Sequence, residues 1–232
     1  MINEDENYRK IKALENKHKG ERIFVIGTGP SLNKTSMHLI KNEVVFCVNS
    51  FLKGWEKFGI LPNYYALSDF RAFKTYYVDV IKLKIPLFSF ENKLKDWSAD
   101  ILNNVIVLKD TLPNKQVGMK TIEDFSKDLT VGSGGTGTVV IDIALQAAYY
   151  MGFKEVYLLG CDCDYTKEHH FHGEQMYDFD HLDLVMERFS DMVFPAYEIS
   201  KQVFEEDDRK IINCTVGGKL EIFERARLED II

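Results

Sequence analysis

The chain has 232 residues, of which 45% are hydrophobic and 28% are charged, with a formal net charge of −7 and a pI near 5.4. This composition suits one globular domain over 1–232 and argues against nonspecific binding to nucleic acid, which needs a basic surface. No apolar run reaches the length of a membrane span, and the acidic N-terminus does not resemble a signal peptide, so we expect a cytoplasmic protein.

The first predicted elements are a helix and a strand. Residues 4–19 have the apolar spacing of a surface helix, and the apolar run 23–26 predicts a strand buried on both faces. A glycine turn follows, made of Gly27, Thr28, Gly29, Pro30 and Ser31. Its backbone and the Ser31 hydroxyl are candidates to face an anion. The alternative is a strand-to-helix turn without a ligand, and Leu32 in place of a third glycine argues against an NAD site.

Two further strands are predicted to end in small polar residues. They cover 44–48 and 64–67, and short helices are expected over 35–41 and 51–58. The polar residues at the two strand ends are Asn49, Ser50, Ser68 and Asp69. In open α/β sheets, ligands bind outside the carboxyl ends of the strands. We therefore expect these residues and the glycine turn to line one crevice.

The middle of the chain, about 71–128, carries more charge and weaker periodicity than its flanks. Short strands are predicted at 86–90 and 105–108, between helical segments. The region suits either crossovers at the periphery of the sheet or a lid over the crevice, and the sequence leaves both open.

A second glycine-rich loop, 132–138, opens a helix that runs to Met151 and precedes a strand over 155–160. Free amides at the positive end of a helix favour an anion. The residues predicted to bind a nucleotide phosphate here are Ser133, Gly134, Gly135 and Thr136. A Walker loop is excluded because Thr138, rather than lysine, follows the last glycine. The alternative is a flexible loop with a threonine N-cap.

Two aspartates and three histidines follow the strand over 155–160. Asp162 and Asp164 form an Asp-x-Asp pair of the kind that can hold a divalent ion against diphosphate oxygens. The histidines, at positions 169, 170 and 172, are candidates for a general base, a general acid or a metal ligand, because imidazole titrates near neutrality. The alternative is a solvated loop that is merely rich in histidine.

The remaining segments are predicted to belong mostly to the core. A helix is expected over about 181–206 with a bend at Pro195, then a last strand over 210–215 and an extended segment over 219–223. Cys47, Cys161, Cys163 and Cys214 lack the paired spacing of a zinc site. We expect them to be reduced thiols in or near the core rather than redox or metal-binding residues.

Several of these motifs, in this order, resemble two related protein groups. The motifs are the turn at 27–32, Asn49, the loop at 132–138, the segment 152–162 and the His170-Phe171-His172 sequence. One group comprises bacterial sialyltransferases that use CMP-sialic acid. The other is the family named for 6-hydroxymethyl-dihydropterin diphosphokinase, the MptE-like family, which the tail at 213–221 resembles more closely.

The alternation of strands and helices predicts a single α/β domain with a mostly parallel sheet and helices on both faces. The resemblance implies a Rossmann-like domain, a GT-A-like variant. It also implies a CMP donor bound against the turn at 27–31, Asn49, Asp162 and the loop that contains Ser133. The sialyltransferases usually have Asn where this chain has Thr28.

The resemblance also implies catalytic residues. The sialyltransferase pattern His-x-x-Gly-His is not reproduced, and His172, which precedes a glycine, is the nearest counterpart of the catalytic histidine. His170 and His181 stay open as alternatives. Tyr165 is implied as the hydroxyl that assists the departing phosphate, and the sialyltransferases work without a metal.

The preferred hypothesis is transfer of a nonulosonic acid, a sialic-acid-like sugar, from a CMP donor to a glycan hydroxyl in surface-polysaccharide synthesis. It requires a nucleotide-sugar donor and a glycan acceptor as partners and no cofactor. One alternative is diphosphoryl transfer from ATP to a hydroxymethylpterin-like alcohol, with Asp162 and Asp164 holding Mg²⁺. Another is a non-catalytic nucleotide-sugar-binding partner. The oligomeric state, a homo-oligomer included, is left open.

Overall fold

The computed structural model describes residues 3–94, 97–111, 118–164, 170–173 and 187–232. The strands within these residues are β1 (Arg22–Ile26), β2 (Val45–Val48), β3 (Tyr64–Ala66), β4 (Leu87–Phe90), β5 (Val105–Leu108), β6 (Glu155–Leu159), β7 (Lys210–Asn213) and β8 (Glu224–Arg225). They form one sheet in the order β5-β4-β3-β2-β1-β6-β7-β8, and all neighbouring strands are parallel. The predicted parallel α/β sheet is thus confirmed.

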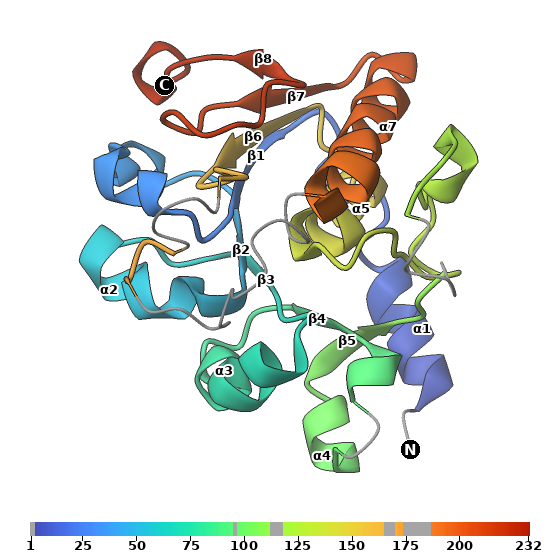
Figure 1. Cartoon of the computed structure of the whole chain (residues 1–232). Helices are drawn as coiled ribbons and strands as arrows, with labels where there is room; N and C mark the ends of the chain where they lie inside the picture. The colour runs from blue at the N-terminus through green and yellow to red at the C-terminus, as the bar shows by residue number, and fades with distance from the viewer. Residues whose placement is uncertain (1–2, 95–96, 112–117, 165–169, 174–186) are drawn as a thin grey trace.

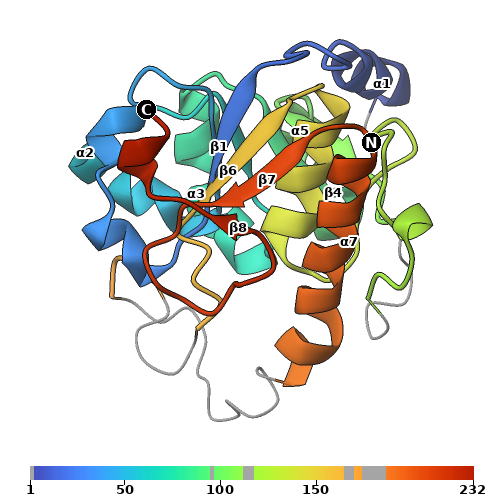
Figure 2. The ribbon, with the colours of Figure 1, turned by 90° about the horizontal axis from the view of Figure 1, so that it is seen from above.

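Helices cover both faces of this sheet (Figures 1 and 2). The helices on one face are α1 (Glu4–Lys12), α5 (Gln146–Tyr150) and α7 (Phe194–Glu206). Those on the other face are α2 (Trp55–Phe58), α3 (Phe70–Lys82) and α4 (Ala99–Leu102). Short 3-10 or π segments are η1 (Pro30–Lys34), η2 (Met37–Ile40), η3 (Asn49–Gly54), η4 (Glu91–Lys93), η5 (Ile122–Asp124), η6 (Val140–Leu145), η7 (Phe189–Val193) and η8 (Leu228–Asp230).

The central strands are apolar throughout because each contributes side chains to two cores. In β1, Ile23 and Val25 belong to one core, whereas Phe24 and Ile26 belong to the other, and all of them are fully buried. A strand with only one covered face would alternate between apolar and polar residues. The uninterrupted apolar runs in the sequence are therefore the signature of helices on both faces. The four cysteines are free and buried, as expected.

The order in which the strands are added to the sheet reverses at β1. The strands β2, β3, β4 and β5 follow one another on one side of β1, whereas β6 pairs with the other side of β1. Residues 71–111 accordingly supply most of α3, then β4, α4 and β5. The carboxyl ends of β1 and β6 lie on either side of this reversal, where an open parallel sheet leaves a crevice for a ligand. Among the described residues, no helix is long and apolar enough to cross a membrane.

Several elements differ from the sequence-based expectations. The first helix ends at Lys12, and turns follow it up to residue 20. The helical backbone continues from residue 187 through η7 and α7 to Glu206, as expected, but it contains a π segment directly before the turn that holds Pro195. Because proline has no N–H to donate, the widened π turn before Pro195 accommodates its ring within the helix. The residues before 187 in that predicted helix lie outside the described residues.

Candidate functional site

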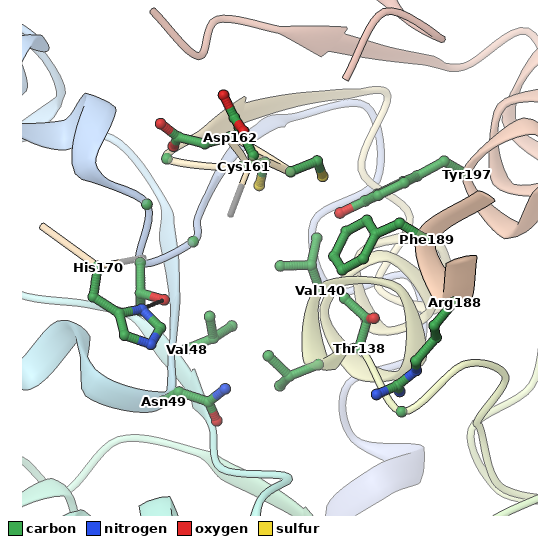
Figure 3. Close-up of a pocket in the computed structure, with 18 residues that line it drawn as sticks. Val48, Asn49, Thr138, Val140, Cys161, Asp162, His170, Arg188, Phe189 and Tyr197 are labelled. Atoms are coloured by element: carbon green, nitrogen blue, oxygen red, sulfur yellow. Dashed lines mark hydrogen bonds between the residues drawn. The ribbon is translucent and has the colours of Figure 1, made fainter. Parts of the chain in front are cut away.

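A cavity of about 300 Å³ lies at the carboxyl ends of β1, β2 and β6, where the chain reverses across the sheet (Figure 3). The predicted nucleotide-binding or catalytic residues in its lining are Gly27, Thr28, Gly29, Asn49, Asp162 and His170. The other described candidates, which are not in the lining, are Pro30, Ser31, Ser50, Asp69, His172 and residues 133–136. Tyr165, His169 and His181 lie outside the described residues.

The first glycine turn is pressed against the end of β6. A Cβ atom on Gly27 would lie 2.4 Å from the carbonyl oxygen of Gly160, and one on Gly29 would lie 1.8 Å from a carboxylate oxygen of Asp162. That carboxylate also accepts a hydrogen bond from the Ser31 hydroxyl at 2.6 Å and one from the Ser31 amide at 3.1 Å. The glycines thus allow two parts of the chain to meet, and the Ser31 donors proposed for an anion bind Asp162 instead. Burial raises the pKa of Asp162, and the bonds from Ser31 oppose this rise.

Asn49 stands at the end of β2 with a left-handed backbone, at φ 46°. The Tyr65 hydroxyl holds this turn, because it donates to the carbonyl oxygen of Asn49 at 2.7 Å and accepts from the Leu52 amide at 2.9 Å. The Asn49 side chain lines the cavity, and its buried Oδ1 atom has no hydrogen-bond partner within the described part of the chain. A buried acceptor without a donor is unfavourable, so a turn of the Asn49 side chain that brings this oxygen to a donor group on a ligand would be favoured.

The second glycine-rich loop is clamped by two side chains of the helix that follows it. The buried carboxylate of Asp142 accepts hydrogen bonds from the amides of Thr136 and Gly137, and from the Thr136 hydroxyl at 3.1 Å. One turn later, Gln146 bonds both the amide and the carbonyl oxygen of Gly134. Of the amides that we expected to be free for a phosphate, those of Ser133, Gly134 and Thr136 therefore bind the protein itself. The Ser133 hydroxyl is also buried, without a partner in the described residues.

The histidines at 170 and 172 have different environments. His170 lines the cavity, and its Nδ1 atom lies 3.0 Å from the Thr28 hydroxyl oxygen. The Nε2 atom of His172, the histidine favoured by the sequence, lies 3.0 Å from the hydroxyl oxygen of buried Ser50. The two rings stack with their centroids 5.3 Å apart. Of these two histidines, the geometry therefore gives His170 the direct access to a ligand in the cavity.

The wall opposite Asn49 and His170 contains Thr138 of the second glycine-rich loop, Phe189, which the sequence places in the core, and Arg188, for which the sequence predicts no role. Figure 3 shows Thr138, Arg188 and Phe189 on this side. Arg188 donates a hydrogen bond to the carbonyl oxygen of Thr136, and no carboxylate in the described parts of the chain pairs with it. In the sequence, Arg188 is a charged position within the predicted helix over 181–206, which gives no indication that the side chain faces a cavity.

The predicted carboxylates have separate partners. Asp164 lines the cavity and forms an ion pair with Lys219 at 3.1 Å, whereas Asp162 binds Ser31. Asp69 lies elsewhere, where it caps α3 by accepting hydrogen bonds from two amides of the first turn. Among the described residues, there is no cluster of three or more side chains suited to a metal.

Burial raises the pKa of the Cys163 thiol to about 12 and that of the neighbouring Cys161 well above its usual value. Both thiols line the cavity. At neutral pH they are protonated, and a protonated thiol is a poor nucleophile. The cavity therefore does not present a thiolate for covalent catalysis at that pH.

Solved structures that share this fold include a glycosyltransferase and a sialyltransferase. A MAf glycosyltransferase from Magnetospirillum magneticum AMB-1 matches with a TM-score of 0.56 and 15% identity over 97% of this chain, but this chain spans only 38% of that protein. The sialyltransferase CstII from Campylobacter jejuni, solved in complex with a substrate analogue, cytidine-5'-monophosphate, matches with a TM-score of 0.53 and 16% identity over 90% of this chain and 85% of that one.

No match was found among curated proteins. The model of the family described as 6-hydroxymethylpterin diphosphokinase MptE-like, by contrast, matches residues 1–168, which is more than half of the chain. With the parallel sheet and the position of the cavity, this match identifies the chain as a member of the MptE-like family.

Proposed function

We propose that the protein is a transferase that moves a nonulosonic acid from a CMP donor to a glycan hydroxyl. The observation that carries this proposal is the pair of walls around the cavity: Asn49 and His170 stand on one side and Arg188 on the other. Asn49 supplies an oxygen that can accept a hydrogen bond from the nucleoside of the sugar donor. His170 supplies a titratable ring for the hydroxyl that receives the sugar, and Arg188 supplies a positive charge for the phosphate. The shared fold with CstII supports the same choice of ligand.

The donor is oriented by two contacts in this proposal. The Asn49 Oδ1 atom accepts a hydrogen bond from an amino or hydroxyl group of the nucleoside, because it has no donor within the described residues. The phosphate faces Arg188, since Asp142 and Gln146 bind the amides of Gly134, Thr136 and Gly137 in the glycine-rich loop. An arginine is well suited to this role because its guanidinium can give a phosphate two hydrogen bonds.

His170 acts as the general base. The acceptor oxygen attacks the anomeric carbon of the donor sugar while its proton passes to the imidazole. The bond between that carbon and the phosphate oxygen breaks, and CMP leaves with the electron pair. The positive charge of Arg188 stabilises the negative charge that develops on the phosphate.

Calorimetry with CMP, ATP and GTP, each with and without magnesium, tests the ligand. We expect CMP to bind without magnesium and to bind more tightly than either purine nucleotide. A protein that bound ATP only with magnesium would contradict the proposal. CMP-sugar binding without turnover, across a panel of glycan acceptors, would support the non-catalytic alternative.

Replacing Arg188 with glutamine should weaken CMP binding about tenfold, equivalent to about 1.4 kcal/mol, because a charged hydrogen bond to phosphate is lost. The matched control is Arg227→Gln, because the Arg227 side chain is 76% exposed and lies outside the cavity lining. The measurement is the CMP dissociation constant at fixed salt. Equal affinity in the Arg188 variant and the wild type would remove this arginine from the phosphate site.

Diphosphoryl transfer is the second candidate, and one observation favours it. Asp162 and Asp164, the two carboxylates expected to hold magnesium, both line the cavity, and the family is named for a diphosphokinase. Holding an ion would require them to exchange their present bonds with Ser31 and Lys219. The measurement is transferase activity with and without EDTA. Loss of this activity on addition of EDTA and its recovery with magnesium would favour diphosphoryl transfer over sugar transfer.

A further inference from the structure

We propose that Gly137 is a positioning residue, which together with the peptide group before it holds the Arg188 guanidinium in the cavity. The second glycine-rich loop would then present an arginine to the phosphate instead of its own amides. The inference rests on the proposed function, because Arg188 is the phosphate ligand of that reaction.

The peptide group between Thr136 and Gly137 is bonded at both ends. Its N–H, which belongs to Gly137, donates to the buried carboxylate of Asp142. Its carbonyl oxygen, which belongs to Thr136, accepts a hydrogen bond from Arg188. Because the N–H and C=O of a planar trans peptide point in opposite directions, this peptide lies between a carboxylate and a guanidinium. Each bond polarises the peptide in the sense that strengthens the other.

Asp142, which belongs to η6, fixes the orientation of this peptide. Its carboxylate also accepts hydrogen bonds from the Thr136 amide at 2.7 Å and from the Thr136 hydroxyl at 3.1 Å. The same hydroxyl oxygen accepts a hydrogen bond from the Thr138 amide at 3.0 Å. The backbone on both sides of the peptide is thus tied to one helix. The direction of the Thr136 carbonyl is therefore set by that helix, and Arg188 meets an acceptor that is already in place.

Gly137 leaves open the space that the guanidinium occupies. Its backbone is left-handed, at φ 78°, and a Cβ atom at this position would lie 2.6 Å from Nη2 of Arg188. That nitrogen is the one that bonds the Thr136 carbonyl oxygen. Among the described residues, the atoms within 4 Å of such a Cβ all belong to Arg188. A side chain at position 137 would therefore displace the flexible end of the arginine and leave the rest of the loop in place.

Arg188 keeps its positive charge available for an anion. It lines the cavity (Figure 3), its bond to the loop goes to a neutral carbonyl oxygen, and no carboxylate in the described parts of the chain pairs with it. A guanidinium carries several N–H donors, so one bond to the loop leaves donors for a bidentate contact with a phosphate. A guanidinium that is already held loses less conformational freedom when the phosphate binds. The loop therefore raises the affinity of the cavity for a phosphate without touching it.

The test compares Gly137→Ala with Gly20→Ala in the full chain. Gly20 is also left-handed, at φ 84°, but a Cβ atom there would meet no described atom within 4 Å, and Gly20 lies outside the cavity lining. Both variants carry similar backbone strain, whereas Gly137→Ala alone displaces Arg188. We expect Gly137→Ala to weaken CMP binding about tenfold and to leave the binding of cytidine, which lacks the phosphate, unchanged. Gly20→Ala should change neither affinity.

Two further measurements link the effect to the arginine. In an Arg188→Gln background, Gly137→Ala should cause no further loss of CMP affinity, because the group that it displaces is absent. Nitrogen-15 NMR of the arginine side chains, with the Arg188 signal identified by its loss in Arg188→Gln, reports the rotation of the guanidinium. We expect hindered rotation in the wild type and in Gly20→Ala, and free rotation in Gly137→Ala.

The spectra separate this inference from the proposed function. CMP affinity that is unchanged in Arg188→Gln would refute the phosphate role of Arg188, and the rotation of its guanidinium would still decide whether the loop positions it. Free rotation in the wild type, or equally hindered rotation in Gly137→Ala, would overturn the inference even if CMP binds as proposed. Equal losses of CMP and cytidine affinity in Gly137→Ala would also overturn it, because they would indicate a general distortion of the cavity.

Discussion

Replacing His170 with alanine is expected to lower turnover about a hundredfold or more, because a positioned general base typically contributes at least that factor. CMP affinity should be unchanged, since the imidazole acts on the acceptor hydroxyl. The wild-type rate should rise with pH as the imidazole loses its proton, and the variant should lack this rise. The measurements are kcat against pH with a saturating donor, and CMP binding by calorimetry.

His172→Ala is the control, because this neighbouring ring bonds Ser50 and lies outside the cavity lining. We expect it to reduce turnover far less than His170→Ala. The opposite result, with turnover abolished only in the His172 variant, would make His172 the base, as the sequence resemblance implies. Normal rates in both variants would eliminate a mechanism that uses either histidine.

Replacing Asp142 with alanine is expected to destabilise the fold by about 3 kcal/mol, because two backbone amides and a buried hydroxyl lose a charged acceptor. For a chain of this size, that loss corresponds to a decrease in Tm of about 6–12 °C. The measurement is thermal or urea unfolding followed by circular dichroism.

The control is Asp79→Ala, which removes an exposed carboxylate that is paired with Lys82 on the helix surface. Such a surface pair is worth little, so we expect a change within about 0.5 kcal/mol. An Asp142 variant as stable as this control would mean that water replaces the carboxylate at the loop amides. The loop would then be open to a bound phosphate, as the sequence analysis expected.

The sheet was predictable because its strands are buried on both faces. A strand such as β5, predicted at 105–108 and observed at Val105–Leu108, leaves an uninterrupted apolar run that is typical of a covered strand in an α/β chain. The two-residue strand β8 was missed, because its residues, Glu224 and Arg225, are charged and too few to form a pattern. The helix after the glycine-rich loop was predicted, but its first part, η6, is a π segment. A π segment depends on tertiary contacts more than on the helix propensity of its residues, so the sequence pattern does not indicate it.

The candidate site was predictable in position but not in its internal bonds. Strand ends, and the glycines beside them, indicate where a parallel sheet leaves a crevice, and Asn49 and His170 do line it. Composition alone does not reveal that Asp142 binds the loop amides, or that Asp162 takes the Ser31 donors. Both carboxylates meet their partners only once the chain has folded.

The bridge made by the Tyr65 hydroxyl between Asn49 and Leu52 has a consequence for the thermodynamics of ligand binding. The left-handed backbone of Asn49 costs about 1 kcal/mol of strain. This strain is already present in the folded protein without a ligand, so it lowers the folding free energy rather than the binding free energy. The Asn49 wall is thus already rigid in the empty protein, and a ligand loses little affinity to ordering it. We expect Tyr65→Phe to shift this cost to the binding step, so that the ligand binds with a less favourable entropy although it never touches residue 65.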